Sequence, residues 1–262
     1  MKTIYFDTEF SEGFFKPISW LPSWIPGNKP VWSIELISIG MVDDAGKEYY
    51  AVNKNFRRGQ CNQWVKENVL TKLPERMIWD EDNWYDRHYM ITEDDSTILT
   101  PNPVYKSLKT IKQDIINFVA PPMMVYDLCA DSIDFQNCLQ FFLEANPIQF
   151  KAYYADYDWV LFCSIFGTMI DLPRGFPKYC YDLKQRFDEY TMQEYTKRTM
   201  AHLNNLMANQ SSDPVVYRQM CKQIRESDTY PKQNPDDEHG AISDARWNKQ
   251  LDLWLNSAIA SL

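Results

Sequence analysis

The order of strand-like and helix-like patterns restricts the fold of this chain more than any other feature. Apolar and polar residues alternate at 3–10, and residues 33–42 form a second run of β-type composition. A third run at 47–54 follows the turn-forming sequence Asp-Asp-Ala-Gly at 43–46. These three successive runs predict strands in an antiparallel meander.

The remaining sequence alternates between helical and strand-like spacing. We expect helices at 62–72, 106–119, 132–145 and about 157–166, and strands at 123–129 and 148–154. Strands first, followed by alternating helices and strands, favour an α/β fold in which helices flank a mixed sheet of five or more strands. No long polar linker divides the chain, so we expect a single domain over 1–262.

Three segments look like additions to this scaffold: residues 11–32, 74–105 and 191–236. The first holds three tryptophans and four prolines. It is too long for a hairpin turn and too apolar for a loose linker, so we expect it to fold over another part of the molecule.

Composition limits the class of protein and the kind of partner. Hydrophobic residues make up 45% of the chain, yet no run approaches the roughly 18 apolar residues of a membrane span, so we expect a soluble cytoplasmic protein. The six cysteines are scattered without a C-x-x-C pair, which favours reduced, buried thiols. The net charge of −9 argues against a broad basic face for nucleic acid, so any such contact should be local and helped by metal ions.

Two acids interrupt the first strand. Side chains two apart in a strand share a face, so Asp7 and Glu9 point the same way, about 6.6 Å apart. At an effective dielectric constant near 20 their charges would repel by about 2.5 kcal/mol, a cost that a bound divalent cation removes. A solvated edge strand is the alternative explanation for the pair.

Two further acids fall on the inward faces of predicted helices. Asp158 shares helical spacing with the apolar Leu161 and Ile165, so it faces the sheet or else caps the helix. Asp244 lies among alanines that would let its helix approach the sheet closely. His239 precedes that helix, where it could reach a site at the sheet; an ordinary surface histidine is the alternative.

Four carboxylates from one strand and two helices match the hard oxygen ligands that Mg²⁺ or Mn²⁺ prefers. Two such ions about 3.5–4 Å apart can clamp the attacking and leaving oxygens of a phosphodiester. We therefore expect Asp7, Glu9, Asp158 and Asp244 to bind two metal ions. His239 fits the general base for the attacking water, because imidazole titrates near neutral pH.

The sequences FDTEF, DYDWVLF and HGAISDA resemble, in order and spacing, the three motifs of the DEDDh branch of the DnaQ-like, or RNase T-like, 3′–5′ exonucleases. The resemblance implies an RNase H-like fold and two-metal hydrolysis that releases nucleoside 5′-monophosphates from a 3′ end. It assigns the metal carboxylates to Asp7, Glu9, Asp158 and Asp244, and the base to His239.

More narrowly, IELISIG (34–40), EYYAV (48–52), the WV…VL…LP run (64–74) and HGAISDAR look similar to small bacterial and phage exoribonucleases described as polyadenylate-specific. The match covers the first strand and residues 33–74, 148–188 and 239–255. This resemblance implies an RNA substrate that is single-stranded or has a 3′ overhang, a bacterial or phage-infected cell, and pairing into homodimers as in related enzymes. The segments without a counterpart there are 11–32, 74–105, 120–147 and 191–236. A DNA exonuclease of the same fold and a catalytically silent nucleic-acid-binding module stay open as alternatives.

Further substrate contacts are predicted near the first strand. Trp20, Trp24 and Trp32 are placed to stack on unpaired bases, or else to pack on the body as a hydrophobic flap. Glu35 is a candidate contact to a terminal ribose or base, or an ordinary strand acid. A second acid cluster comprises Asp127, Asp131 and Asp134. It is most simply a helix cap with solvated neighbours.

Overall fold

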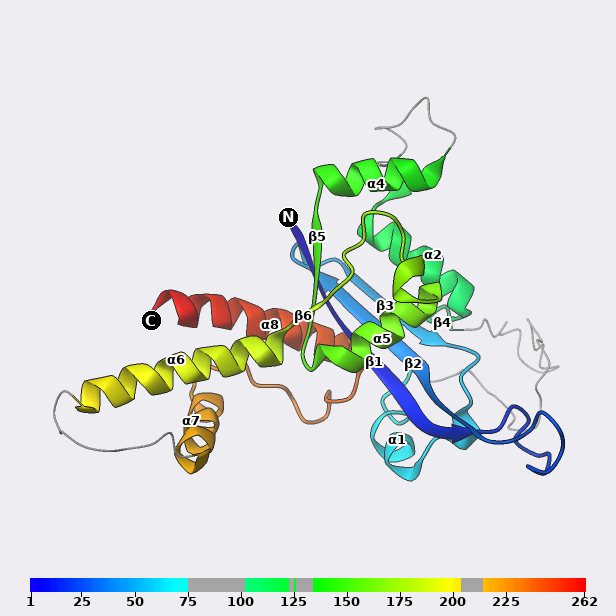
Figure 1. Ribbon diagram of the computed structural model, residues 1–262, viewed down its shortest axis with the longest axis horizontal. Coiled ribbons are helices and arrows are strands. Elements are labelled where there is room, and N and C mark those ends of the chain that lie inside the picture. Colours follow the sequence, from blue (N-terminus) through cyan, green and yellow to red (C-terminus); the bar gives the residue numbers. More distant parts are fainter. Residues whose placement is uncertain (75–101, 123–124, 126–133, 204–213) are drawn as a thin grey trace, which may run out of the picture.

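The computed structural model describes residues 1–74, 102–122, 125, 134–203 and 214–262. Within them, six strands form one mixed sheet in the order β4-β3-β2-β1-β5-β6, and seven α-helices flank it (Figure 1). The α/β prediction is confirmed, and the mixed sheet is consistent with an RNase H-like fold. The predicted strand at 123–129 falls almost wholly outside the described residues, and the single domain stays a prediction.

The antiparallel half of the sheet matches the predicted meander. β1 (Lys2–Phe15), β2 (Val31–Asp43) and β3 (Glu48–Asn53) are neighbours in space in the same order as in sequence. β1 and β2 are longer than predicted, because the ladder continues until Phe15 pairs with Val31. The two ends of segment 11–32, residues 11–15 and 31–32, are therefore strand extensions, and the segment projects from the sheet (Figure 1).

The parallel half consists of short strands. β5 (Ile148–Ala152) pairs with β1, β6 (Tyr181–Asp182) pairs with β5, and β4 (Tyr105–Lys106) pairs with β3. β5 reaches along β1 only as far as Tyr5. Beyond that residue, one edge of β1 has no strand partner within the described part of the chain.

The described α-helices are α1 (Gln63–Asn68), α2 (Leu108–Val119), α4 (Phe135–Ala145), α5 (Ala155–Phe166), α6 (Leu183–Leu203), α7 (Pro214–Glu226) and α8 (Ala241–Ala260). Two 3₁₀ helices, η1 (Arg58–Gln60) and η2 (Met169–Asp171), accompany them. Side chains of Asn62, Ser107 and Asp134 accept backbone hydrogen bonds at the starts of α1, α2 and α4, which fixes where these helices begin. None of the described helices is long and apolar enough to cross a membrane.

The two faces of the sheet carry different cores. Ile4 and Phe6 of β1 join residues of α2, α4 and α5 in one apolar cluster. Tyr5 points to the opposite face and packs with α6, α7 and α8. Because side chains alternate along a strand, Asp7 belongs to the α8 face and Thr8 to the α5 face.

The first turn of α8 lies very close to the sheet. Gly40 pairs with Asp7 across β1 and β2, and a β-carbon at Gly40 would lie 2.3 Å from the backbone of Ala241. The buried Asn248 donates a hydrogen bond of 3.0 Å to the carbonyl of Phe6. Only glycine at position 40 lets α8 begin directly beside Asp7.

A buried charged group holds α8 one turn further along. Asp252, 1% exposed, accepts hydrogen bonds of 2.8 Å from the Tyr5 hydroxyl and from Lys151 Nζ. Arg186 of α6 is its third partner. Because its partners lie on β1, β5 and α6, Asp252 fixes the position of α8 against three elements.

Candidate active site

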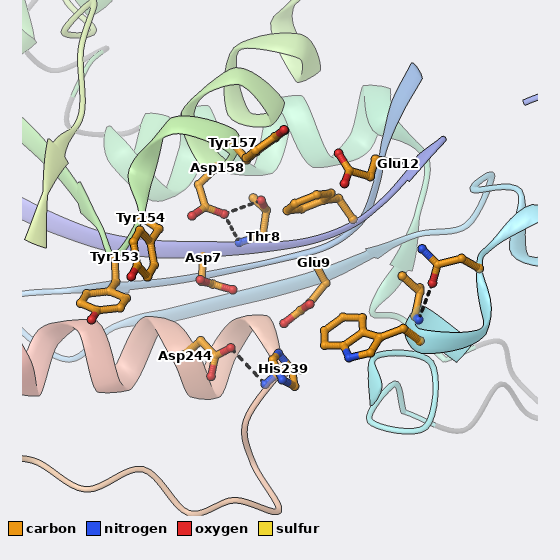
Figure 2. Close-up of a pocket in the computed structure, with 14 residues that line it drawn as sticks. Asp7, Thr8, Glu9, Glu12, Tyr153, Tyr154, Tyr157, Asp158, His239 and Asp244 are labelled. Atoms are coloured by element: carbon orange, nitrogen blue, oxygen red, sulfur yellow. Dashed lines mark hydrogen bonds between the residues drawn. The ribbon is translucent and has the colours of Figure 1, made fainter. Parts of the chain in front are cut away.

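Asp158 lies at the open edge of β1. Both the backbone N–H and the hydroxyl of Thr8 donate to Asp158 Oδ1, at 2.9 and 2.6 Å (Figure 2). The N-cap of α5 is Tyr154, and no side chain caps that helix, so Asp158 does not serve as a cap. Helix α5 therefore presents this acid to β1, on the inward face that the spacing predicted.

Glu9, His239 and Asp244 meet on the α8 face. Their potential ligand atoms all lie within 4.8 Å of one another. The His239 backbone N–H donates to Asp244 Oδ2 at 3.2 Å, and the Gln233 side-chain amide donates to Asp244 Oδ1. Figure 2 shows Asp7 beside them on β1, pointing towards Asp244. The loop before α8 thus fixes both the histidine and the acid.

One cavity of about 370 Å³ joins these groups. All five predicted catalytic residues line it: Asp7, Glu9, Asp158, His239 and Asp244. They reach it from β1, from α5 and from the start of α8. The remaining lining residues are Thr8, Phe10, Glu12, Asn62, Trp64, Val65, Tyr153, Tyr154 and Tyr157. No lysine or arginine occurs among these described lining residues.

Burial and mutual repulsion make the carboxylates of the cavity hard to ionise. Burial, with added repulsion from Asp244 and Asp158, raises the pKa of Glu9 to about 8. Burial also raises the pKa of Asp158 to about 7, against the opposing hydrogen bonds from Thr8. The pKa of Asp244 rises to about 6, again mainly through burial.

The pKa of Asp7 lies well above its ordinary value, through burial first and then repulsion from Asp158, Glu9 and Asp244. Asp7 as a residue nonetheless remains partly exposed to the solvent.

The free oxygens of these acids suit a cation. Asp7 and Glu9 accept no hydrogen bond from any residue that the structure describes, and Asp158 Oδ2 accepts none either. Buried carboxylates normally have hydrogen-bond or ionic partners. Unpaired carboxylate oxygens that converge from several elements are the donor set of Mg²⁺ and Mn²⁺ sites, so the residues present fit such an ion.

Two residues of the cavity have an unusual backbone. Tyr154 and His239 adopt left-handed conformations, with φ of 56° and 63°, and they are the two non-glycine residues with positive φ in the described part of the chain. Such conformations are costly without a glycine and often mark functional sites. In His239 the left-handed turn precedes the first residue of α8 and directs the imidazole towards Glu9 (Figure 2).

An aromatic rim surrounds the acids, and the sequence patterns did not single it out. Phe10 stacks on Tyr157 with ring centres 5.3 Å apart. Trp64, on the capped helix α1, meets His239 edge-to-face at 4.9 Å. Phe10 directly follows Glu9, and Tyr157 directly precedes Asp158. Their position next to a predicted catalytic acid is the signal that could have identified them. No comparable signal marked Trp64.

The predicted substrate contacts lie outside the cavity. Glu35 instead binds Arg57, accepting from its backbone N–H at 2.8 Å and from Nε at 3.2 Å. Trp20, Trp24 and Trp32 lie in the projecting hairpin with their rings exposed. Of the second acid cluster, Asp134 caps α4 as predicted, whereas Asp127 and Asp131 lie outside the described residues.

Comparison with known proteins identifies distant relatives. No known family profile matches the chain. Two curated Mycobacterium tuberculosis proteins, from strains CDC 1551 and H37Rv, are each 27% identical to it over 157 residues. The similar region covers 60% of this chain and 67% of each relative, and both relatives are named 3′-5′ exoribonuclease. The chain is thus a distant relative of proteins named for RNA hydrolysis from the 3′ end.

Proposed function

We propose that the protein is a metal-dependent 3′–5′ exoribonuclease that releases nucleoside 5′-monophosphates. The observation that carries this proposal is the meeting of Asp7, Glu9, Asp158, Asp244 and His239 around one cavity, from three distant parts of the chain. A site that gathers buried acids without a cationic partner lowers the stability of the fold. A loss of stability of this kind is expected at a functional site, where the acids bind a ligand. The name of the two relatives supports RNA and the direction of attack.

The four carboxylates are the proposed ligands of two Mg²⁺ or Mn²⁺ ions. When bound, such ions supply Lewis-acid stabilisation of the charge that develops on the phosphodiester and lower the pKa of an attacking water. The protein keeps its acids in place for this purpose. Thr8 holds one oxygen of Asp158 and leaves the other without a hydrogen-bond partner among the described residues, while Gln233 and the His239 N–H orient Asp244.

His239 is the proposed general base, which takes the proton of the attacking water on a ring nitrogen. Its imidazole lies beside Glu9 and packs edge-on against Trp64, and its backbone is fixed by Asp244. These contacts place the ring at the cavity within reach of an attacking water, as base catalysis requires. The same geometry would also let His239 ligate a metal with Glu9 and Asp244. The base role requires metal binding to survive in His239→Ala.

Digestion of single-stranded RNA labelled on its last phosphodiester tests this function. DNA of the same sequence is digested in parallel, and each substrate is incubated with Mg²⁺, with Mn²⁺ or with EDTA. We expect labelled mononucleotide to appear first, from RNA in preference to DNA, and not in EDTA. Preferential release from DNA would support the DNA exonuclease, and RNA binding without cleavage would support the silent module. Longer labelled fragments would show that the enzyme cuts internally and would refute attack from the 3′ end.

A further inference from the structure

The hairpin formed by residues 11–33, here called the arm, has an unusual surface. It comprises the outer ends of β1 and β2 and the loop between them, and it projects from the body of the molecule (Figure 1). Trp20 and Trp24 are 80% and 77% exposed, and Phe14 and Trp32 are 72% and 51% exposed. Large apolar rings this exposed in one place are characteristic of a binding surface.

One buried side chain, Asn28, joins several parts of the loop of the arm. Asn28 is 2% exposed, and its Oδ1 accepts from the Ile18 N–H at 2.8 Å. Its Nδ2 donates to the carbonyls of Ile18, Leu21 and Pro22 at 3.0, 2.8 and 3.3 Å. The loop is therefore an ordered platform, and Trp20 and Trp24 are presented from it without needing to be ordered by a ligand.

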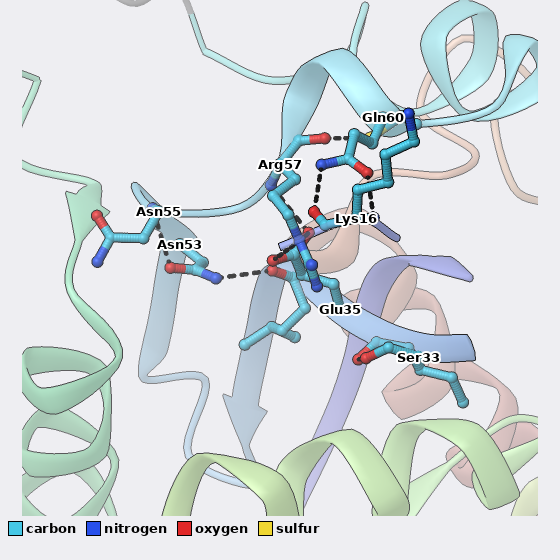
Figure 3. A network of polar contacts seen from close by, with 10 residues as sticks. Lys16, Ser33, Glu35, Asn53, Asn55, Arg57 and Gln60 are labelled. Carbon is cyan, nitrogen blue, oxygen red and sulfur yellow. Dashed lines mark hydrogen bonds and ion pairs between the residues drawn. The ribbon is translucent and has the colours of Figure 1, made fainter. Parts of the chain in front are cut away.

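The base of the arm is attached to η1 on its other face (Figure 3). Gln60 accepts from the Lys16 N–H at 2.9 Å and donates to the Lys16 carbonyl at 3.1 Å. Arg57 lies 4.5 Å over the ring of Phe15 while it pairs with Glu35. Glu35, predicted as a substrate contact, thus supports the arm. Arg57 and Gln60 cover the inner face of the arm at its base.

The outer face continues the rim of the cavity. Phe10 and Glu12 line the cavity, and Phe14 follows on the same side of β1, about 13 Å beyond Phe10. Phe14 is paired directly with Trp32 of β2. A row of rings therefore leads from Tyr157 and Phe10 at the cavity to Phe14 and Trp32 on the arm.

The charge of the arm differs from that of the chain. The chain carries −9, whereas the arm has two lysines, Lys16 and Lys29, against one acid, Glu12. Neither lysine forms an ion pair with a residue that the structure describes. Exposed rings beside uncompensated cations are the combination that binds single-stranded nucleic acid without sequence preference.

We propose that the arm anchors the unpaired part of an RNA whose 3′ end occupies the cavity, with bases stacked on its exposed rings. This inference rests on the proposed exoribonuclease function, because it takes the arm to continue a cavity that binds RNA. A dinucleotide is too short to use the arm. The protein therefore prefers long single strands, and this preference depends on the rings of the arm.

Two double variants, Trp20→Ala with Trp24→Ala and Phe14→Ala with Trp32→Ala, test the proposal. Phe141→Ala is the matched control, since Phe141 is 64% exposed on α4, away from both the arm and the cavity. Binding of 5′-fluorescein oligouridylate of about 20 nucleotides is measured by anisotropy in EDTA, so that binding is read without hydrolysis. The KM for that RNA and for a dinucleotide is measured with Mg²⁺, and molar mass is measured by light scattering.

We expect each double variant to bind the long RNA about tenfold more weakly or worse, and to lose its preference for long RNA over dinucleotide to a similar extent. Phe141→Ala should match the wild type. Unchanged affinity in an enzyme that hydrolyses RNA would overturn the arm's role and leave the exoribonuclease intact. If the double variants bind RNA more weakly but the wild-type protein hydrolyses no RNA, the RNA-binding role of the arm is supported and the exoribonuclease function is refuted. A change from dimer to monomer at unchanged RNA affinity would assign the arm to self-association instead.

Discussion

The cavity proposed as the active site and the arm depart from ordinary burial in opposite directions. In the cavity, the ionisable residues Glu9 and Asp158 are buried. In the arm, the large apolar residues Trp20 and Trp24 are exposed to solvent. Both departures lower the stability of the fold. In each region a buried, hydrogen-bonded asparagine lies behind the costly residues: Asn248 on the inner face of α8 and Asn28 inside the loop. The buried acids and the exposed tryptophans are the residues that we propose act on RNA. The buried asparagines, whose side chains are hydrogen-bonded, hold them in place.

Asp7→Asn is the strongest test of the cavity's side of this comparison. We expect turnover to be abolished, because the proposed metal site loses a ligand that three other acids surround. The metal-free variant should be at least as stable as the wild type towards urea, since one source of repulsion is removed. Asp156→Asn is the control: this acid is exposed on α5 two positions before Asp158 and does not line the cavity. Unfolding of Asp7→Asn would identify Asp7 as a structural acid.

His239→Ala tests whether the cavity contains a base as well as ligands. Hydrolysis should slow by roughly 10²–10⁴-fold, the usual contribution of a positioned base. Calorimetric titration with Mn²⁺ should give nearly the same affinity as the wild type. If metal binding is lost together with activity, then His239 is a ligand alongside Glu9 and Asp244, and the base must be sought elsewhere.

The raised pKa values predict how the stability of the metal-free protein depends on pH. Burial in the folded protein raises the pKa of Asp244, Asp158 and Glu9 to about 6, 7 and 8, from about 4 in the unfolded chain. Between these values the folded state binds more protons, so the free energy of unfolding falls as pH rises from about 5 to 8, by up to about 1.4 kcal/mol per pH unit for each proton. Urea unfolding across this range should show the fall, and Glu9→Gln should reduce its upper part. Mg²⁺ should flatten the curve, and a stability that instead rises with pH would contradict the assigned burial.

Gly40→Ala tests whether the cavity depends on the close approach of α8. The new methyl group would overlap the backbone of Ala241, so α8 must move away from β2. We expect a loss of about 1–3 kcal/mol in the free energy of unfolding, typical of overpacking, together with weaker Mn²⁺ binding, because Asp244 moves with the helix. Gly59→Ala is the matched control, since a β-carbon there meets no atom within 4 Å. Equal stability of the two variants would show that α8 can adjust without cost.

The sequence predicted those parts of the molecule in which periodicity and burial agree. β3 and α2 lie within a few residues of their predicted bounds, because their apolar faces are buried and regular. The acids proposed to be catalytic were noticed for the opposite reason: Asp158 occupies a buried position of a helix where the spacing predicts an apolar residue. Regular apolar spacing thus predicted the elements of the fold, and an acid that interrupts this spacing predicted a residue of the candidate site.

The missed features depend on tertiary contacts that no local pattern encodes. The outer part of β1 was read as an insertion, because Gly13 and the prolines that follow conceal a ladder that continues to Phe15. β4 and β6 have two residues each, too few to show a period. Trp64 reaches His239 only because α1 docks beside the start of α8.

Asn28→Ala gives the smallest expected effect and the finest test of the comparison. It leaves every ring of the arm in the sequence but removes the side chain that holds the loop carbonyls together. Because the loop projects from the body, the free energy of global unfolding should change little, whereas RNA affinity should fall a few-fold as the cost of ordering the loop moves into binding. Ser19→Ala, at an exposed position of the same loop, is the control. Full affinity in Asn28→Ala would show that the rings bind without a prepared platform, so that the arm, unlike the cavity, needs no polar scaffold behind it.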